Sequence, residues 1–265
     1  MASNVVTPKA HRLVSILPQT ETEWTFRVEH HGPVNHGQFM QLSLPRVGEC
    51  PISISGFTDD TVDFTIRRVG HVTDELFNLK PGDDLFLRGT YGNGWPYQEI
   101  KDKNLVIIAG GTGVSPVKSM INALHDADGD KQVYLILGFK DDHAILFRDE
   151  LEKWRANPRF HCIYCLDHMS AEGFHEGMVT AFLDQVPFAE FGDDYACVVV
   201  GPPVMMRFAG LGLLRQGVPE EKIWMSFERR MSCAVGKCGH CRIDETYVCL
   251  DGPVFNYTKA KQLID

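Results

Sequence analysis

The chain has 265 residues, of which 44% are apolar, and this length and composition predict a sizeable core divided between two domains of ordinary size with a small appendage. Its formal net charge of -9 argues against nucleic acid as the main partner, because phosphate backbones are bound by an excess of Lys and Arg. The first residues lack a basic segment followed by an apolar run, and no stretch of about 18 apolar residues occurs, so we expect a cytoplasmic protein without a membrane span.

Residues 1–100 read as short β segments at regular intervals. Gly, Pro and Asp turns separate the segments, for example Lys80–Asp83. The candidate strands are 12–17, 24–29, 38–44, 62–68 and 84–88, with a further apolar strand at 50–56. This spacing predicts a small antiparallel β-barrel.

Parts of this barrel carry residues suited to a flavin. The strand Cys50–Gly56 presents hydroxyls that could lie against the edge of a flat ring, although an ordinary edge strand would look the same. Arg67 and Arg68 end a strand just before a predicted helix start at His71–Thr73, which is one way to hold a pyrophosphate, and a solvated pair of charges is the alternative. The glycine-rich stretch Leu87–Trp95 allows close approach to a ligand or serves as a hinge.

Residues 101–225 change in character, and we expect a doubly wound parallel sheet there. The wholly apolar strand Leu105–Ala109 is typical of strands buried on both faces. It runs into Gly110–Pro116 and a helix, so that amide N–H groups of the turn would face a phosphate, although the turn departs from the usual Gly-x-Gly-x-x-Gly pattern. Further strands at 133–139, 159–165 and 197–200 alternate with helices.

The last of these strands ends in Gly201–Met206. Small residues at the carboxyl end of such a strand line the crevice where nucleotides bind, whereas the two methionines could equally belong to the core. Between the other strands, Phe139–His143 contains acids that could bond a ribose diol and repel a 2′-phosphate, which favours NADH over NADPH.

The C-terminal stretch holds half of the eight cysteines. Cys233, Cys238, Cys241 and Cys249 have a spacing close to that of plant-type [2Fe-2S] proteins. The glycines among them let backbone N–H groups turn toward the sulfides, and Lys237 and Arg242 would raise the cluster potential. Structural zinc is the best alternative, but only one pair has knuckle spacing; a disulfide framework is poorer.

Together these segments resemble the ferredoxin reductase-like FAD/NAD(P)-binding flavoproteins, in the branch with a C-terminal [2Fe-2S] cluster. That branch includes the electron-transfer subunit of dihydroorotate dehydrogenase and the γ subunit of sulfur-linked hydrogenases. The runs Ser226–Cys241 and Tyr247–Phe255 are most similar to the B subunits of anaerobic sulfite reductases.

The resemblance implies an FAD-binding β-barrel domain at 1–100, an NAD(P)-binding α/β domain at 101–225 and a [2Fe-2S] subdomain at 226–265. It places FAD at Pro51, Ile52, Ser53, Thr65, Ile66, Arg67, Val72 and Thr73. It places the nicotinamide nucleotide at Gly110, Gly111, Thr112, Gly113, Val114, Gly201, Pro202, Met205 and Met206. The cluster ligands implied are Cys233, Cys238, Cys241 and Cys249.

Two departures from the family pattern concern the flavin. Cys50 stands where members usually carry an arginine, and Ile52 where they often carry a tyrosine, so we expect the FAD phosphate contact at Arg67 or Arg68. Val200 replaces the cysteine that many reductases place before the last Gly-Pro.

The expected function is oxidation of NAD(P)H through FAD, with single electrons leaving through the cluster and no protein acid or base required. The resemblance implies an iron-sulfur subunit and a sirohaem catalytic subunit, reducing sulfite to sulfide, as partners. Lys237, His240 and Arg242 would form the docking face. The alternatives are the same redox module in a hydrogenase or dihydroorotate dehydrogenase, and a zinc-stabilised interaction module without enzymatic activity.

Overall fold

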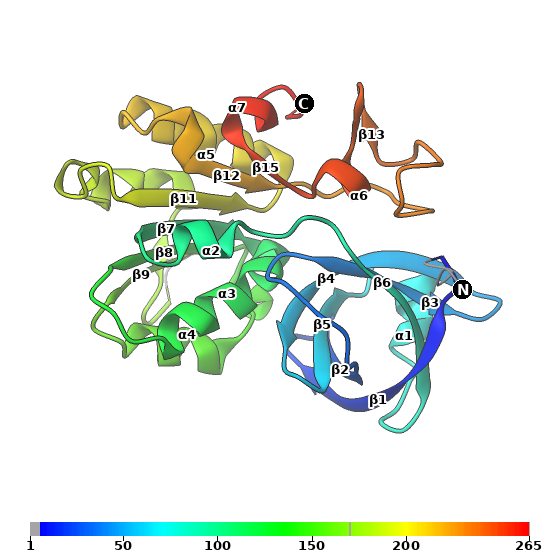
Figure 1. The fold of residues 1–265 in the computed structure, drawn as a ribbon. Coiled ribbons are helices and arrows are strands. Elements are labelled where there is room, and N and C mark those ends of the chain that lie inside the picture. Colours follow the sequence, from blue (N-terminus) through cyan, green and yellow to red (C-terminus); the bar gives the residue numbers. More distant parts are fainter. Residues whose placement is uncertain (1–5, 170, 265) are drawn as a thin grey trace. The chain divides into compact units, whose positions relative to one another are not determined.

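The computed structural model describes residues 6–169 and 171–264 (Figure 1). The chain divides into two compact units, one formed by Met1–Trp95 with Phe227–Pro253 and the other by Pro96–Ser226 with Val254–Asp265. Within the described ranges, no helix is both long enough and apolar enough to cross a membrane.

The first unit is built on a closed barrel of six antiparallel strands in the order β1-β2-β5-β4-β3-β6, which confirms the predicted barrel. Its strands are β1 (Lys9–Pro18), β2 (Glu23–Glu29), β3 (Phe39–Leu44), β4 (Gly48–Phe57), β5 (Thr61–Arg67) and β6 (Asp84–Tyr91). Helix α1 (His71–Leu76) lies between β5 and β6 in the sequence.

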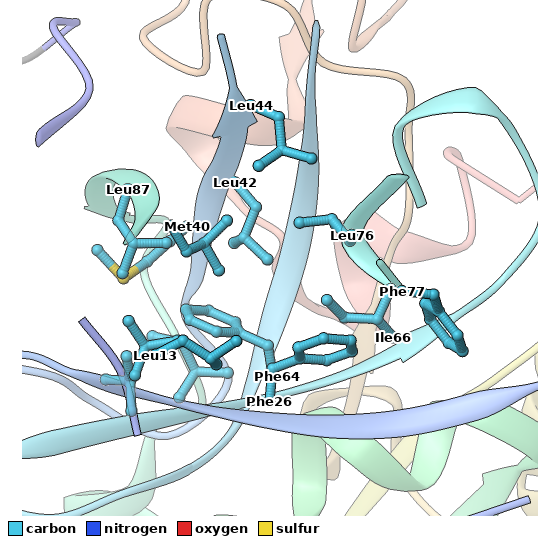
Figure 2. Packing of buried hydrophobic residues seen from close by; sticks show 14 residues of the cluster. Leu13, Phe26, Met40, Leu42, Leu44, Phe64, Ile66, Leu76, Phe77 and Leu87 are labelled. Carbon is cyan, nitrogen blue, oxygen red and sulfur yellow. The ribbon is translucent and has the colours of Figure 1, made fainter. Parts of the chain in front are cut away.

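Alternating apolar side chains of the strands fill the barrel (Figure 2). Phe26 and Phe64 face each other across paired positions of β2 and β5 and are fully buried. Met40 and Leu42 alternate along β3 with Gln41, so the two apolar residues face the core. Leu76 of α1 joins the same cluster. Each such side chain stabilises the fold by about 1.5–3 kcal/mol relative to exposure.

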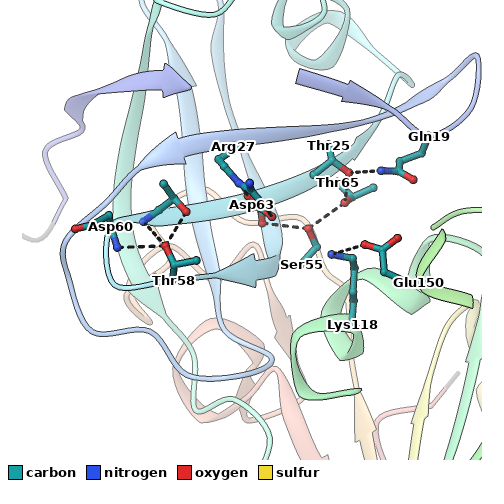
Figure 3. A network of polar contacts seen from close by, with 11 residues as sticks. Gln19, Thr25, Arg27, Ser55, Thr58, Asp60, Asp63, Thr65, Lys118 and Glu150 are labelled. Carbon is teal, nitrogen blue, oxygen red and sulfur yellow. Dashed lines mark hydrogen bonds and ion pairs between the residues drawn. The ribbon is translucent and has the colours of Figure 1, made fainter. Parts of the chain in front are cut away.

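A chain of polar contacts ties β2, β5 and β4 together (Figure 3). Arg27 donates to both carboxylate oxygens of Asp63, from Nε and Nη2, each at 2.8 Å. The Ser55 hydroxyl donates to the Asp63 carbonyl at 3.1 Å and accepts from Thr65 at 2.9 Å, and the Thr65 hydroxyl lies 2.9 Å from that of Thr25. These buried hydroxyls are therefore satisfied within the barrel.

The second unit is a seven-stranded sheet in the order β10-β9-β8-β7-β11-β12-β15. Its strands are β7 (Asn104–Gly110), β8 (Val133–Phe139), β9 (Phe160–Leu166), β10 (His175–Glu176), β11 (Tyr195–Val200), β12 (Ile223–Ser226) and β15 (Val254–Asn256). All neighbours pair parallel except β12 with β15. The predicted parallel sheet is thus confirmed, and the strand order reverses between β7 and β11.

Helices cover both faces of this sheet, with α3 and α4 on one side and α5 and α7 on the other (Figure 1). The α-helices are α2 (Tyr97–Ile100), α3 (Ser115–Asp126), α4 (Arg148–Arg155), α5 (Pro203–Arg215) and α7 (Tyr257–Ala260). Short 3-10 helices are η1 (Gly111–Val114), η2 (Asp142–Ala144), η3 (Val179–Gln185), η4 (Phe188–Glu190) and η5 (Glu220–Lys222).

The cysteine segment contains β13 (Arg242–Ile243), β14 (Thr246–Tyr247) and α6 (Val248–Asp251). It groups with the barrel as Phe227–Pro253, whereas the residues after it return to the sheet, where Trp224 of β12 pairs with Asn256 of β15. This grouping differs from the expected limits of 1–100, 101–225 and 226–265, because the strand pairing of β15 was not visible in the sequence pattern.

The barrel unit should lose stability in mild acid because of His36. Burial lowers the pKa of His36 to about 4, and its ring lies 5.0 Å from that of Phe57. In the unfolded chain a histidine titrates near 6.5, so the unfolded state binds the extra proton first as the pH falls. We expect a loss on the order of 2 kcal/mol in unfolding free energy between pH 6.5 and 4.

Denaturant titrations across this pH range measure the effect. His36→Phe keeps an aromatic ring against Phe57 but cannot titrate, so its stability should fall less steeply than that of the wild type; His71→Phe, at an exposed position, is the control. Parallel pH profiles for wild type and His36→Phe would contradict this account.

Candidate functional site

The four clustered cysteines lie in one loop and one short helix of the barrel unit. Cys233, Cys238 and Cys241 precede β13, and Cys249 lies in α6. Cys241 and Cys249 are buried, Cys233 is half-buried and Cys238 is exposed. The Cys238 side chain interacts with that of Cys233, and the Cys249 side chain interacts with those of Cys241 and Cys233. The fold therefore brings the four thiols of the sequence pattern into one group.

Backbone N–H groups of the loop point at these sulfurs. The amides of Val235, Lys237 and Cys238 donate to Sγ of Cys233 at 3.3–3.4 Å. The amide of Gly236 donates to Sγ of Cys249 at 3.2 Å. Gly236 has a φ of 69°, and a Cβ there would lie 2.8 Å from the Leu250 side chain, so only glycine fits this position.

The donor set fits a two-iron cluster better than a single ion. In the described part of the chain, no three His, Cys, Asp or Glu side chains are grouped closely enough to hold one metal ion, whereas tetrahedral zinc needs four donors around one point. A [2Fe-2S] cluster is held by four thiolates divided between two irons, so its ligands spread over more space than those of a single ion. Hydrogen bonds from the backbone of His240 and Cys233 lower the pKa of the Cys238 thiol to about 7, which favours the ligating thiolate.

The expected flavin strand lies on β4. Pro51, Ile52 and Ser53 are half-buried there, and Pro51 is paired with Gln41 of β3. Gln41 is fully buried, and neither atom of its amide has a hydrogen-bond partner among the described residues. A buried, unpaired amide beside Pro51 fits a cofactor edge that offers both donors and acceptors.

The second expected flavin segment lies beside the first, since Ile54 of β4 pairs with Phe64 of β5. The side chains of this segment differ in whether they are free to contact a ligand. The Thr65 hydroxyl is already bonded within the barrel, and the Ile66 side chain is fully buried in the barrel core, so neither is free to contact a ligand. Arg67 is exposed and its Nε lies 3.1 Å from Glu23.

The residues expected to hold the FAD phosphates are only partly free to do so. Arg68 is exposed and its Nε bonds Asp74 at 2.9 Å. The Thr73 hydroxyl accepts from the amides of Val69 and Gly70 at the start of α1, and Val72 packs against the barrel core. Cys50, at the place of the family arginine, is mostly buried, which raises the pKa of its thiol to about 12. A phosphate contact from Arg67 or Arg68 would therefore compete with an existing ion pair.

The nucleotide turn sits where the strand order reverses. Ala109 at the end of β7 pairs with Val200 at the end of β11, which brings the predicted turn against Gly201. A Cβ on Gly113 would lie 2.7 Å from the Val200 carbonyl oxygen. The Met205 side chain covers the other two glycines, because a Cβ on Gly110 or Gly201 would meet it at 2.5 or 2.7 Å.

The other residues expected at the nucleotide divide into core and surface. Val114 and Met206 are buried, whereas Gly111, Thr112 and Gly201 are partly exposed and Pro202 is exposed. Ser115 begins α3, is only 3% exposed, and its hydroxyl has no partner among the described residues. A hydroxyl beside the N-terminal amides of a 12-residue helix suits an anionic oxygen such as that of a phosphate.

The acids after β8 have local roles. The Asp141 carboxylate accepts from the amide of Ala144 at 3.1 Å and caps η2. Asp142 pairs with Arg148 at 3.1 Å and stays about half exposed. Asp141 is therefore committed to the cap, whereas the charge of Asp142 is partly neutralised by Arg148.

Sequence reasoning missed two polar residues of these sites, Gln41 and Ser115. Gln41 interrupts an apolar strand, and that single polar residue at a buried position was the available signal.

Gly113→Ala should weaken nucleotide binding because its Cβ would force the turn away from the Val200 carbonyl. We expect the KM for the reduced nicotinamide nucleotide to rise about tenfold or more. Gly212→Ala is the steric control, because a Cβ at this position of α5 would lie 2.5 Å from the Leu183 side chain of η3. Steady-state kinetics with a dye acceptor measure both, and equal KM values in the two variants would refute the role of the turn.

Comparisons with known proteins show which families this chain is similar to. Residues 107–210 match the oxidoreductase NAD-binding domain, and residues 228–261 match the iron-sulfur cluster binding domain of dihydroorotate dehydrogenase B. The chain is 34% identical to the sulfhydrogenase 2 subunit gamma of Pyrococcus furiosus, covering 94% of each protein. It is 32% identical to a probable dihydroorotate dehydrogenase B (NAD(+)) electron transfer subunit of Methanocaldococcus jannaschii, covering 96% of this chain and 91% of that protein.

A solved structure of an NADH-dependent reduced ferredoxin-NADP oxidoreductase shares the fold, with a TM-score of 0.78, 24% identity and coverage of 99% of this chain and 94% of that one. The chain therefore belongs to the ferredoxin reductase-like family of FAD- and NAD-binding proteins that carry an iron-sulfur cluster binding domain of the dihydroorotate dehydrogenase B type.

Proposed function

We propose that the chain is the electron-input subunit of an oxidoreductase complex, taking electrons from NADH and passing them singly to a partner subunit. The observation that carries this proposal is the group of four cysteines, in which loop amides donate to the sulfurs of Cys233 and Cys249. The same chain has a glycine turn where the strand order of a parallel sheet reverses. When bound, FAD accepts electron pairs from nicotinamide and releases single electrons to an iron-sulfur cluster.

The chain's own residues bind and orient these groups. The Gly110–Val114 turn and the N-terminus of α3 would hold the nucleotide phosphates, and the β4 strand with Gln41 would hold the edge of the flavin. Cys233, Cys238, Cys241 and Cys249 would ligate the [2Fe-2S] cluster, and the loop amides bonded to their sulfurs would stabilise the thiolate charge.

The partner is proposed from the relatives. Those reported above are named as a hydrogenase subunit and a dihydroorotate dehydrogenase subunit, so these complexes are favoured over the sulfite-reducing complex with its sirohaem subunit that the C-terminal runs suggested. Reconstitution with each class of catalytic subunit, followed by assays for NAD(+)-linked hydrogen oxidation, dihydroorotate oxidation and sulfite reduction, distinguishes the three. Sulfite reduction alone would reverse the preference.

Electrons would leave at the exposed side of the cysteine loop. Cys238, Lys237 and His240 are exposed there, and Leu250 of α6 is 61% exposed. Arg242 donates to the Asp244 carbonyl and forms an ion pair with Glu245, which partly neutralises its charge. An apolar residue beside a positive rim is a suitable docking surface for an acidic partner.

Cys233→Ala should abolish the cluster while leaving the hydride step intact. We expect the wild-type chain to contain two irons and two labile sulfides per FAD, and its flavin absorbance to bleach before that of the cluster on mixing with NADH. The variant should show only flavin bleaching. Cys197→Ala, at a fully buried cysteine of the sheet, is the control. A colourless protein with one zinc per chain would contradict the proposal and support the interaction-module alternative.

The preference for NADH is proposed from Asp142, the acid left near the end of β8. Asp142→Asn should lower the ratio of kcat/KM for NADH over NADPH by about tenfold, because the repulsion of a 2′-phosphate is lost. Asp193→Asn, which alters an exposed carboxylate paired with Lys222, should leave the ratio unchanged. A wild-type ratio that favours NADPH would overturn the preference.

A further inference from the structure

Arg88 is a buried cation in the barrel wall next to the cysteine loop. It lies in β6, only 5% exposed, and its register partner on β3 is Gln41, which in turn pairs with Pro51 on β4. The neighbours Leu87, Met40 and Leu42 face the barrel core, so Arg88, Gln41 and Pro51 form a row on the opposite face of the strands.

The Arg88 guanidinium uses each of its five N–H donors. Nε and Nη2 donate to the two carboxylate oxygens of Glu49, with the Nε bond at 2.9 Å. Nη1 donates to the Tyr91 hydroxyl at 3.2 Å and to the Cys233 carbonyl at 2.7 Å, and Nη2 also donates to the Ser232 carbonyl. Burial acts to lower the pKa of Arg88, but the bonds to Glu49 and Tyr91 outweigh it, so the guanidinium stays charged.

These bonds join the expected flavin strand to the first cysteine of the loop. Glu49 lies on β4, two residues before Pro51, and Cys233 is the first of the four thiols. Both residues are held by one planar group. Lysine could not replace it, because an ammonium has only three donors and no fixed fork.

The loop beyond Cys233 has a conformation that needs such support. Ala234 is buried with a φ of 59°, a left-handed conformation that is unfavourable for a residue with a Cβ. With the carbonyls of Ser232 and Cys233 bound to Arg88, the following amides of Val235, Lys237 and Cys238 are directed at the Cys233 sulfur. Arg88 and the amides thus fix opposite sides of the same turn.

We propose that Arg88, braced by Glu49, is a positioning residue that fixes the first cluster thiolate relative to the flavin strand and thereby sets the retention of the cluster and the rate at which it is reduced. The proposal rests on the proposed electron-transfer function, but the holding of the loop by Arg88 does not require any cofactor.

The test compares Arg88→Lys and Glu49→Gln with Arg27→Lys in the full-length chain. Arg27 is the matched control because it makes the same two-pronged contact to a carboxylate, Asp63, elsewhere in the barrel. Iron, sulfide and FAD contents, the midpoint potential of the cluster, and the rates of flavin and cluster bleaching with NADH are measured for each.

In Arg88→Lys and Glu49→Gln we expect an unchanged FAD content and an unchanged rate of flavin bleaching. The rate of cluster bleaching, or the resistance of the cluster to a chelator, should fall by about 10–100-fold, as for residues that orient metal ligands. Arg27→Lys should match the wild type in both measurements. Normal cluster retention, potential and bleaching rate in a folded Arg88→Lys protein would overturn the proposal.

Two further measurements separate this proposal from a loss of folding and from failure of the proposed function. Hydrogen exchange of the metal-free chain should show faster exchange at Val235, Lys237 and Cys238 in Arg88→Lys but not in Arg27→Lys, whatever the metal content; equal exchange would overturn the proposal. Ala234→Gly, which accepts a positive φ without strain, should restore part of the cluster retention to Arg88→Lys. No restoration would show that Arg88 does not act by holding this turn.

Discussion

The ion pair between the buried Arg88 and the half-buried Glu49 is the contact on which the candidate cluster site depends. Taking a guanidinium out of water is expensive, and the cost is offset only if every donor finds a partner. The barrel supplies Glu49 and Tyr91, but the remaining donors are satisfied by carbonyls of the cysteine loop. The loop therefore supplies hydrogen-bond acceptors that the barrel lacks, and Arg88 of the barrel holds the loop. This explains why Phe227–Pro253 groups with the barrel, although 132 residue numbers separate Trp95 from Phe227.

In the sheet unit, the candidate nucleotide site depends on close packing of the backbone. The turn after β7 can approach the end of β11 only because Gly110, Gly113 and Gly201 leave no side chain between them, and Met205 fills the space above. Binding at such a place uses backbone amides and a helix N-terminus rather than charged side chains, so it is insensitive to the acidic balance of the chain as a whole.

Most of the architecture could be predicted because it depends on local periodicity. Alternating apolar residues indicated the barrel, and continuous apolar runs such as Leu105–Ala109 indicated the parallel sheet. The amide-bonded thiols also follow from the Cys and Gly pattern. Contacts across long sequence separations left no such signal: Arg88 meets Cys233 over 145 residues, and β15 pairs with β12 after the whole cysteine segment. The exposure of Arg67 and the burial of Ile66 depend likewise on how β5 faces the core.

The pairing of β12 with β15 makes the cysteine segment an insertion within a hairpin. Ser226 and Val254 are register partners, and the amide of Phe227 donates to the Pro253 carbonyl at 2.9 Å, so the segment leaves and re-enters the sheet at adjacent points. The hydrogen bonds between β12 and β15 hold the two ends together, so the sheet rather than the cysteines offsets the entropy lost on closing this loop. A short turn could join the same two ends. The segment could therefore be deleted while β15 stays paired in register with β12 at the edge of the sheet.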